Sequence, residues 1–472
     1  MERTDKEKFY YSLGQLVYAF HELCFSYFFL FFYTSVIGIS PAIVGIAIFV
    51  SLIIDAINDP FIGGYSDGQI SEKWGQRNGL MLFSLPLLSI GLLLSFNPPI
   101  ALSEMGLVIW MFVCIVFTRS AVSLFFVPYL ALGVDMSRDY VERSEIAAWR
   151  FLTSSAIILI FAAFFVAVIL ADSPNYPDGR LNQQGYSHIG WISALASFAF
   201  GLICIFKSRK FISSKHQSRS EKWEVFNLNS LKLIMTSKHL IILVLIFSFF
   251  STLVGMKSSL YLYIYSDFWG LSQINIGLLS LTPLLIIFPS FIFTKRITLS
   301  YGKKTGLILC MIGFAITFVL PIMFHYLGAF DDLSNTLLLA VVFVPYTIGQ
   351  FFIISAPMLL YGLAADVTDE VQERLGKSQK GFVLGVVSVC RKSALGLGGL
   401  AGGLILQMAQ PPRSLDSTKT VDVNASYIAL LCAIAVIFVV SLFVFTIRYH
   451  SLSHANVLAI QKKLQRGFQL DG

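Results

Sequence analysis

The sequence predicts an all-α polytopic membrane protein with twelve transmembrane helices in two six-helix bundles. The chain has 472 residues, is 56% hydrophobic and has a mean hydropathy of +0.75. Only 13% of its residues are charged, which is about half the share found in soluble domains. Apolar runs of about 20 residues, long enough to cross a bilayer as helices, recur along the whole length. A soluble helical protein would need far more polar surface.

We place twelve spans along the chain. The first follows a charged start that has no small-residue cleavage site, so we expect a spanning helix there and not a signal peptide. The six cysteines lie singly in apolar runs and lack metal-ligand spacing, so we expect packing residues and no disulfides. The spans cover approximately residues 9–37, 41–65, 78–97, 105–135, 144–171, 189–207, 239–267, 274–294, 304–326, 335–366, 379–408 and 425–449.

Lysine and arginine residues indicate the orientation in the membrane. With the N-terminus inside, the inside loops and both termini carry most of the 34 basic residues. The outside loops then carry only Arg180, Arg413 and Lys419. We therefore expect cytoplasmic N- and C-termini in a plasma (inner) membrane. The net charge of +7 is mainly a topology signal, and we expect no nucleic-acid partner.

A basic, Ser-rich segment divides the spans six and six. We expect an N-terminal six-helix bundle over 1–207, a cytoplasmic middle loop over 208–238, a C-terminal bundle over 239–449 and a cytoplasmic tail over 450–472. An internal repeat supports this division, because Trp74-Gly-Gln-Arg-Asn-Gly-Leu-Met-Leu recurs as Tyr301-Gly-Lys-Lys-Thr-Gly-Leu-Ile-Leu. Each copy follows the second span of its half, as two parallel repeats require.

The most unusual polar stretch is Asp55-Ala-Ile-Asn-Asp-Pro60, inside an apolar helix. Asp55 and Asp59 are four residues apart and so lie on one helix face, roughly 6 Å from each other. Asn58 shares that flank. Like charges in a low-dielectric setting repel and are costly unless compensated. A metal cation, a proton or a basic side chain must therefore lie beside the two carboxylates, and Ser123 is a candidate for a further oxygen ligand.

Other charged residues within the spans mark candidate ion or substrate paths. A purely structural network of the two aspartates with Arg119 and Lys392 is the alternative to a cation site. Glu22 is a candidate proton site. For Lys257 three roles remain open: contact with an anionic substrate group, pairing with an aspartate of the second span, or extension toward the membrane surface. The full set comprises Glu22, Arg119, Arg150, Lys257, Arg391 and Lys392.

Asp67, after the second span, is a candidate for a cytoplasmic latch with nearby cations such as Arg77. The alternative is an ordinary interfacial charge.

Four sequence features together carry a resemblance to a known family. They are Asp55-x-x-Asn-Asp-Pro-x-x-Gly, Tyr33-Thr34 with Val36-x-Gly38-x-Ser40, Asp67 with Gly75-x-Arg77, and Ala365-Asp366-x-x-Asp369. They resemble the glycoside–pentoside–hexuronide:cation symporters, the melibiose-permease branch of the major facilitator superfamily. The resemblance covers nearly the whole chain and implies the major facilitator fold, alternating access, and sugar uptake driven by Na⁺, Li⁺ or H⁺.

The resemblance also implies roles for particular residues. Asp55, Asn58 and Asp59 match the cation site, Ser123 its hydroxyl, and Lys392 the lysine that interacts with it. Arg150 matches an arginine of the fifth helix. The two acidic residues that bind galactosides in the family fall on Ala19 and Phe126 in this sequence, so we do not expect an α-galactoside substrate.

We therefore expect a cation-coupled symporter that imports a sugar, glycoside or sugar acid, with Na⁺, Li⁺ or H⁺ as the coupling cation and no other cofactor or metal. The expected partners are a small-molecule substrate, the cation and the lipid bilayer, and we expect a monomer. The predicted residues are Asp55, Asn58, Asp59 and Ser123 for the cation; Lys392, Arg119 and Glu22 for coupling; Tyr18, Ala19, Phe126, Arg150, Lys257 and Arg391 for substrate; and Asp67, Arg77 and Asp366 for the cytoplasmic gate.

Two other classes of function remain alternatives. The apolar Ala19 and Phe126 favour a lysophospholipid or another amphiphile as the runner-up substrate. A non-transporting membrane receptor is a further alternative, although the retained charges argue against it. We expect no enzyme, because no nucleophile–base group or metal-ligand cluster is evident.

Overall fold

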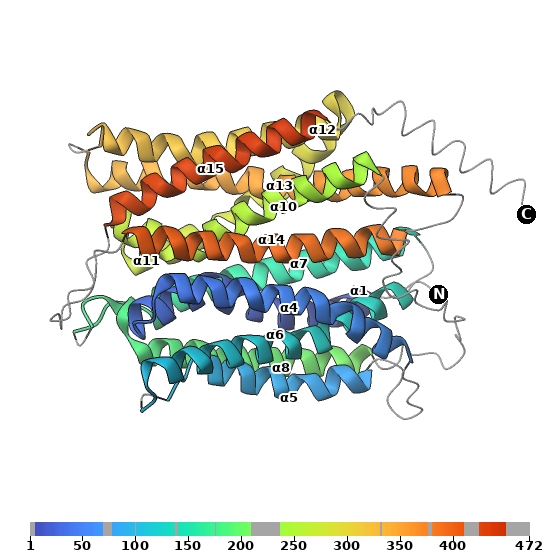
Figure 1. Cartoon of the computed structure of the whole chain (residues 1–472), viewed down its shortest axis with the longest axis horizontal. Helices are drawn as coiled ribbons and strands as arrows, with labels where there is room; N and C mark the ends of the chain where they lie inside the picture. Colours follow the sequence, from blue (N-terminus) through green and yellow to red (C-terminus); the bar gives the residue numbers. More distant parts are fainter. Residues whose placement is uncertain are drawn as a thin grey trace, which may run out of the picture. The chain divides into compact units, whose positions relative to one another are not determined.

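The computed structural model describes residues 5–68, 78–99, 101–136, 140–174, 176–208, 237–330, 333–375, 380–409 and 424–449. Within these residues the chain is almost wholly helical (Figure 1), apart from connections and one isolated bridge between Ser173 and Tyr176. The described part holds eleven segments long and apolar enough to span a membrane. One of them, Gln273–Tyr326, is 54 residues long and contains two of the twelve expected spans. The all-α polytopic fold is therefore confirmed.

The helices follow the expected spans closely. Short π-helical turns interrupt or extend several of them, at Cys24–Phe28, Phe32–Val36, Phe165–Ile169 and Tyr263–Phe268. In chain order the helices are α1 (Asp5–Ser12), α2 (Gly14–Leu23), α3 (Phe29–Phe31), α4 (Pro41–Gly68), α5 (Asn78–Ser95), α6 (Glu104–Asp135), α7 (Tyr140–Phe164), α8 (Gln183–Ser208), α10 (Lys238–Ser259), α11 (Gln273–Leu281), α12 (Pro283–Tyr326), α13 (Asn335–Leu375), α14 (Lys380–Ala409) and α15 (Ala425–Arg448).

The segment around Gly302 differs from the expected boundaries. We expected spans over 274–294 and 304–326 with a loop between them. Instead, the first break comes early, where Pro283 begins α12. The second break is confined to Gly302, whose φ of 80° is a left-handed conformation open to glycine. The connection therefore takes one residue, because a single glycine can redirect the chain between two helices.

The chain forms two compact units, and each is described by itself. Unit 1 comprises Met1–Val225, Gly255–Leu281 and Gly396–Ala425. Unit 2 comprises Phe226–Val254, Thr282–Leu395 and Ser426–Gly472. Helices α10 and α14 both begin in unit 2 and end in unit 1. The domain boundaries given above, at 207, 238 and 449, remain a prediction.

In unit 1, α5 packs against both α6 and α8, and α4 packs against α6 (Figure 1). The α5–α6 contact is close because Gly91 faces Thr118, where an added Cβ would lie 2.5 Å from the threonine hydroxyl oxygen. Small residues allow helix backbones to approach in this way. The main packing contact of unit 2 joins α12 to α13. The packing of α4 on α6 places the second span's polar stretch against Ser123.

Several expectations lie outside the described residues. They concern the middle loop, the C-terminal tail, the first copy of the repeat and the gate residue Arg77.

Candidate functional site

The two acids of the second span lie at the interface of α4 and α6. Ser123 of α6 donates a hydrogen bond of 2.5 Å to Oδ1 of Asp55. Both side chains are buried, with 5% of Asp55 and 3% of Ser123 exposed. One turn earlier on α6, Ser120 accepts a hydrogen bond of 3.2 Å from the amide of Asn58. The structure thus gathers carboxylate, amide and hydroxyl oxygens from two helices, and we call Asp55, Asn58, Asp59, Ser120 and Ser123 the acid cluster.

Both helices of the acid cluster carry an internal proline at the same offset. Pro60 follows Asp55 by five residues in α4, and Pro128 follows Ser123 by five residues in α6. A proline has no N–H, so it leaves the carbonyl four residues earlier without its helical hydrogen bond. Those carbonyls belong to Ala56 and Leu124, each next in sequence to a member of the acid cluster. Additional oxygen ligands are therefore available beside the carboxylates.

Arg119 and Lys392 are the predicted basic partners of the acid cluster. Arg119, on α6, is 4% exposed, and its guanidinium carbon lies 5.6 Å from the centroid of the Phe25 ring. Lys392, on α14, is 8% exposed. It belongs to unit 2, as does Arg391. The coupling network of these residues with the aspartates therefore stays a prediction.

A second polar group lies along α2 and the turn after it. Residues Gln15, Ala19 and Glu22 are spaced by four and three, so they share one helix face. Arg150 of α7 donates two hydrogen bonds, of 2.8 and 3.2 Å, to the side-chain oxygen of Gln15. Glu22 accepts a hydrogen bond of 2.6 Å from Ser26. We call Gln15, Glu22, Ser26 and Arg150 the polar stripe.

Aromatic rings flank the polar stripe. Tyr18 stacks on Phe126, with ring centroids 4.3 Å apart and planes 21° apart. The guanidinium of Arg150 lies 5.3 Å from the centroid of the Tyr129 ring. These rings place the predicted substrate residues Tyr18, Phe126 and Arg150 around the face that carries Ala19. Half-buried polar groups beside stacked aromatic rings are features of small-molecule sites.

Lys257 lies near the end of α10, in the part of that helix that belongs to unit 1. The next residue, Ser258, hydrogen-bonds with Tyr27, which follows the polar stripe on the first span. The ring of Tyr27 also meets that of Tyr261 edge-on, at 5.4 Å between centroids. The segment carrying Lys257 is thereby held against the first span.

One end of unit 1 is closed by contacts between segments far apart in sequence. Arg180, in the connection between α7 and α8, forms an ion pair of 2.6 Å with Asp267. It also makes a two-bond contact with Asp178, at 2.7 and 2.9 Å. Burial lowers the pKa of Arg180, but the hydrogen bond and charge of Asp178 and the ion pair with Asp267 outweigh it and raise that pKa. The guanidinium therefore stays charged although it is 7% exposed.

Further contacts join the end of the first span to Tyr263 and the start of α4 to Gly403. The Tyr263 hydroxyl lies 2.5 Å from that of Thr34 and 2.7 Å from that of Ser35. Gly403 of α14 approaches the start of α4 so closely that an added Cβ would lie 2.4 Å from the carbonyl oxygen of Pro41. We call Arg180, Asp267, Tyr263 and Gly403, with the residues they contact, the end lock.

Of the predicted gate residues, the structure describes the side chain of Asp366 alone. Its carboxylate accepts hydrogen bonds of 2.7 Å at both oxygens from Lys303, in unit 2. Arg77 and the side chain of Asp67 lie outside the described residues. The gate role of all three stays a prediction.

Gln15, Ser120, Tyr27 and Arg180 were not among the residues singled out from the sequence. Gln15 and Ser120 carried a usable signal, because each lies three or four residues from a predicted site residue and so on the same helix face. The ion pair of Arg180 with Asp267 had none, since nothing local links two residues so far apart in the chain.

Comparisons with known proteins identify the family of the chain. Residues 10–451 match the family described as MFS/sugar transport protein, and the chain belongs to that family. The "Uncharacterized symporter YnaJ" of Bacillus subtilis is 27% identical over 87% of this chain and 86% of its own length. The "Putative glycoside/cation symporter YagG" of Escherichia coli is 23% identical over 98% and 95%. The "Isoprimeverose transporter" of Lactiplantibacillus pentosus is 23% identical over 92% and 88%.

Solved structures show the same fold. The nucleoside transporter NupG superposes with a TM-score of 0.61 at 16% identity, covering 94% of this chain and 100% of that one. The xylose transporter XylE from E. coli, in an inward open conformation, also gives 0.61, at 13% identity, covering 91% and 94%. The protein is therefore a multi-pass membrane transporter and not an enzyme.

The acid cluster generates a first prediction. Replacing Ser123→Ala removes the hydroxyl that donates to Asp55 and can bind a cation. We expect the cation concentration for half-maximal thermal stabilisation to rise roughly tenfold, since a hydrogen bond to a charged group contributes about 1.5 kcal/mol. The measurement is the thermal midpoint of purified protein titrated with NaCl or LiCl, with choline chloride holding ionic strength constant.

The matched control is Ser84→Ala, which also removes a buried hydroxyl but one bonded to the carbonyl of Met81 in its own helix. It should leave the titration unchanged. Equal titration curves for the parent and the Ser123 variant would remove this serine from the site.

Proposed function

We propose that the protein is a cation-coupled symporter that imports a sugar, glycoside or sugar acid by alternating access. The observation that carries the proposal is the acid cluster, in which a buried serine donates to Asp55 four residues from Asp59, in a member of a sugar-transport family. Named relatives add support, since YagG is described as a glycoside/cation symporter and the Lactiplantibacillus protein as an isoprimeverose transporter.

The acid cluster explains how a cation gradient can drive the cycle. Two carboxylates in a buried site repel each other and lose hydration, so the charged and empty pair is unfavourable. A monovalent cation brings positive charge to the two carboxylates and takes the carboxylate, hydroxyl and carbonyl oxygens as ligands. The bound cation thus favours the conformation in which the cluster is buried, and differential binding of this kind couples two states. Na⁺, Li⁺ and H⁺ all satisfy this requirement.

The polar stripe and its aromatic rings are the proposed substrate site. Sugars present hydroxyl groups to charged and amide side chains and a flat apolar face to aromatic rings. Arg150 held by Gln15, Glu22 held by Ser26, and the stacked Tyr18 and Phe126 provide both kinds of surface. Lys257 adds an amino group that can pair with the carboxylate of a sugar acid.

We propose that the protein is a monomer in the plasma (inner) membrane. Both termini then lie in the cytoplasm. The end lock then lies on the outer side, because the first span ends there and α4 begins there. In this orientation the contacts of the end lock hold together the outer end of unit 1. Import requires the end lock to open so that substrate and cation enter.

Substrate uptake tests the proposed function and generates a second prediction. We expect counterflow of labelled sugars or sugar acids into proteoliposomes, and none of lysophospholipids. Replacing Gln15→Leu frees the Arg150 guanidinium, so the KM for the accepted substrate should rise roughly tenfold, while cation affinity stays unchanged. Gln184→Leu, at an exposed side chain, is the matched control. Counterflow of lysophospholipids with no sugar counterflow would contradict the proposal.

Lys257→Met refines that measurement. It should impair uptake of sugar acids and spare neutral sugars. Normal transport of every accepted substrate in this variant would remove Lys257 from the substrate site.

The end lock generates a third prediction. Asp267→Asn weakens its ion pair with Arg180 and should shift the protein toward the outward-open state. A partly buried ion pair contributing about 1 kcal/mol changes that population roughly fivefold. Labelling of Ser35→Cys by an impermeant thiol reagent added outside should accelerate by that factor. The native cysteines provide the background rate in protein without the new cysteine.

Two controls accompany the labelling. Glu104→Gln removes an exposed charge outside the end lock and should leave the rate unchanged. Ser35→Cys in the otherwise unchanged protein is the second control and should be labelled slowly. Fast labelling in the parent itself would contradict the closed outer side.

A further inference from the structure

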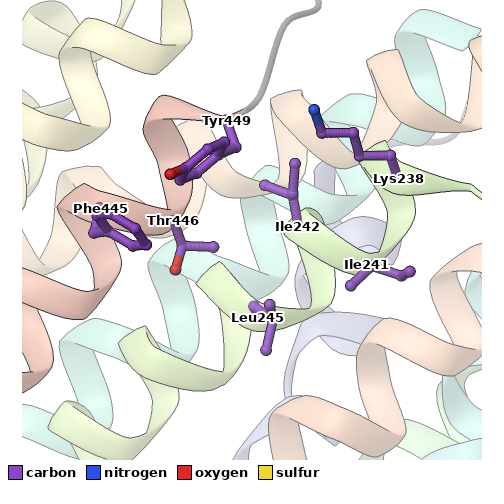
Figure 2. Close-up of a pocket in the computed structure, with 7 residues that line it drawn as sticks. All are labelled: Lys238, Ile241, Ile242, Leu245, Phe445, Thr446 and Tyr449. Carbon is purple, nitrogen blue, oxygen red and sulfur yellow. The ribbon is translucent and has the colours of Figure 1, made fainter.

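Unit 2 contains an open groove between the start of α10 and the end of α15 (Figure 2). Its volume is about 410 Å³, and its lining residues are Lys238, Ile241, Ile242, Leu245, Phe445, Thr446 and Tyr449. Most of the apolar lining is exposed: 40% of Ile241, 40% of Leu245 and 60% of Phe445. On the outside of spanning helices, such a surface faces lipid chains.

The groove has a polar rim at one end. Lys238, the first residue of α10, has its ammonium 6.0 Å from the centroid of the Tyr449 ring. At the same end, Lys304 donates a hydrogen bond of 3.0 Å to the backbone carbonyl of Arg448. Three cationic side chains, those of Lys238, Lys304 and Arg448, therefore lie at this end of α10 and α15.

The rim has no acidic residue among the seven that line the groove. His239, next to Lys238 in sequence, pairs with Glu370 of α13 at 2.9 Å. Ile242, which also lines the groove, is 5% exposed. The groove thus joins an apolar, membrane-facing channel to a positively charged rim.

We propose that this groove binds an anionic phospholipid of the inner leaflet. The acyl chains lie along Ile241, Leu245 and Phe445, and the phosphate lies at the ammonium of Lys238, beside the Tyr449 ring. Lysine and tyrosine at the ends of spanning helices lie at headgroup level, and basic residues there attract anionic lipids. The inference rests on the proposed orientation, but it uses no residue of the acid cluster or the polar stripe.

The site joins two helices that no loop connects. Lys238 begins α10, which ends in unit 1, and Tyr449 follows the last helix of the described chain. A lipid held by both residues should stabilise the packing of α10 on α15.

Lipid titration of the full-length protein in detergent tests the proposal. The probes are dioleoyl phosphatidylglycerol and dioleoyl phosphatidylcholine, which share chains and differ in charge. Native mass spectrometry counts bound lipids, and thermal unfolding gives the midpoint. We expect one tightly bound phosphatidylglycerol, with affinity roughly fivefold above that of phosphatidylcholine, the factor that one favourable basic contact gives. Only the anionic lipid should raise the midpoint clearly.

Two variants locate the site. Lys238→Gln should reduce the affinity for phosphatidylglycerol to that for phosphatidylcholine. Leu245→Trp fills the groove and should weaken binding of both lipids, without changing charge. Lys295→Gln, at an exposed lysine of α12 outside the groove, is the matched control and should retain the preference.

Other outcomes overturn the proposal. They are equal affinity for both lipids, a preference that survives in Lys238→Gln, or the same loss in Lys295→Gln as in Lys238→Gln. Glycerol 3-phosphate is the remaining arm, because it carries the charge without chains. If it raises the midpoint as phosphatidylglycerol does, the site binds free phosphate and not a lipid. Sugar counterflow is measured on the same preparations, so failure here is distinguishable from failure of the proposed transport function.

Discussion

The repulsion between two carboxylates inside an apolar helix is the constraint on which the rest of the proposed mechanism depends. Asp55 and Asp59 lie one turn apart on α4, where Asp55 is buried and Asp59 half-buried, so little water screens the two charges. Oxygen ligands for a cation surround the two acids. They are the hydroxyl of Ser123, bonded to Asp55, the hydroxyl of Ser120, bonded to Asn58, and the carbonyls that Pro60 and Pro128 leave without a helical hydrogen bond. Such a cluster is well suited to a small cation. Its occupancy then sets which conformation the helices around it prefer.

The end lock and the polar stripe connect that constraint to transport. Both belong to unit 1, as does the acid cluster. The first span takes part in both the polar stripe and the end lock, because Gln15 and Glu22 lie in its first two thirds and Thr34 and Ser35 at its end. One π-helical turn, Cys24–Phe28, follows Glu22, and a second, Phe32–Val36, contains Thr34 and Ser35. Turns of this kind often mark functional positions in helices. A change at the substrate residues therefore has a direct covalent path to the contacts that close the outer side.

Much of this fold could be predicted from the sequence. Apolar runs and the lysine and arginine distribution define the spans, because a bilayer imposes a length and an asymmetry on each one. The acid pair was evident from spacing alone. Ser123 was a candidate oxygen ligand from the sequence, and the structure places its hydroxyl on Asp55. Contacts between residues far apart in sequence were harder to predict. Gln15 and Arg150 are 135 residues apart, and no local pattern links Arg180 to Asp267. The break at Gly302 was expected as a longer loop, since a one-residue connection depends on a backbone angle that sequence pattern does not report.

Gradient-driven accumulation tests the central claim, that cation binding at Asp55 and Asp59 energises uptake. Proteoliposomes are loaded without cation, and uptake of the accepted sugar is followed with and without an inward cation gradient. The account predicts that the parent accumulates sugar above the external concentration only with the gradient. Asp59→Asn should still exchange sugar in counterflow but fail to accumulate it. Accumulation by that variant equal to that of the parent would contradict the account.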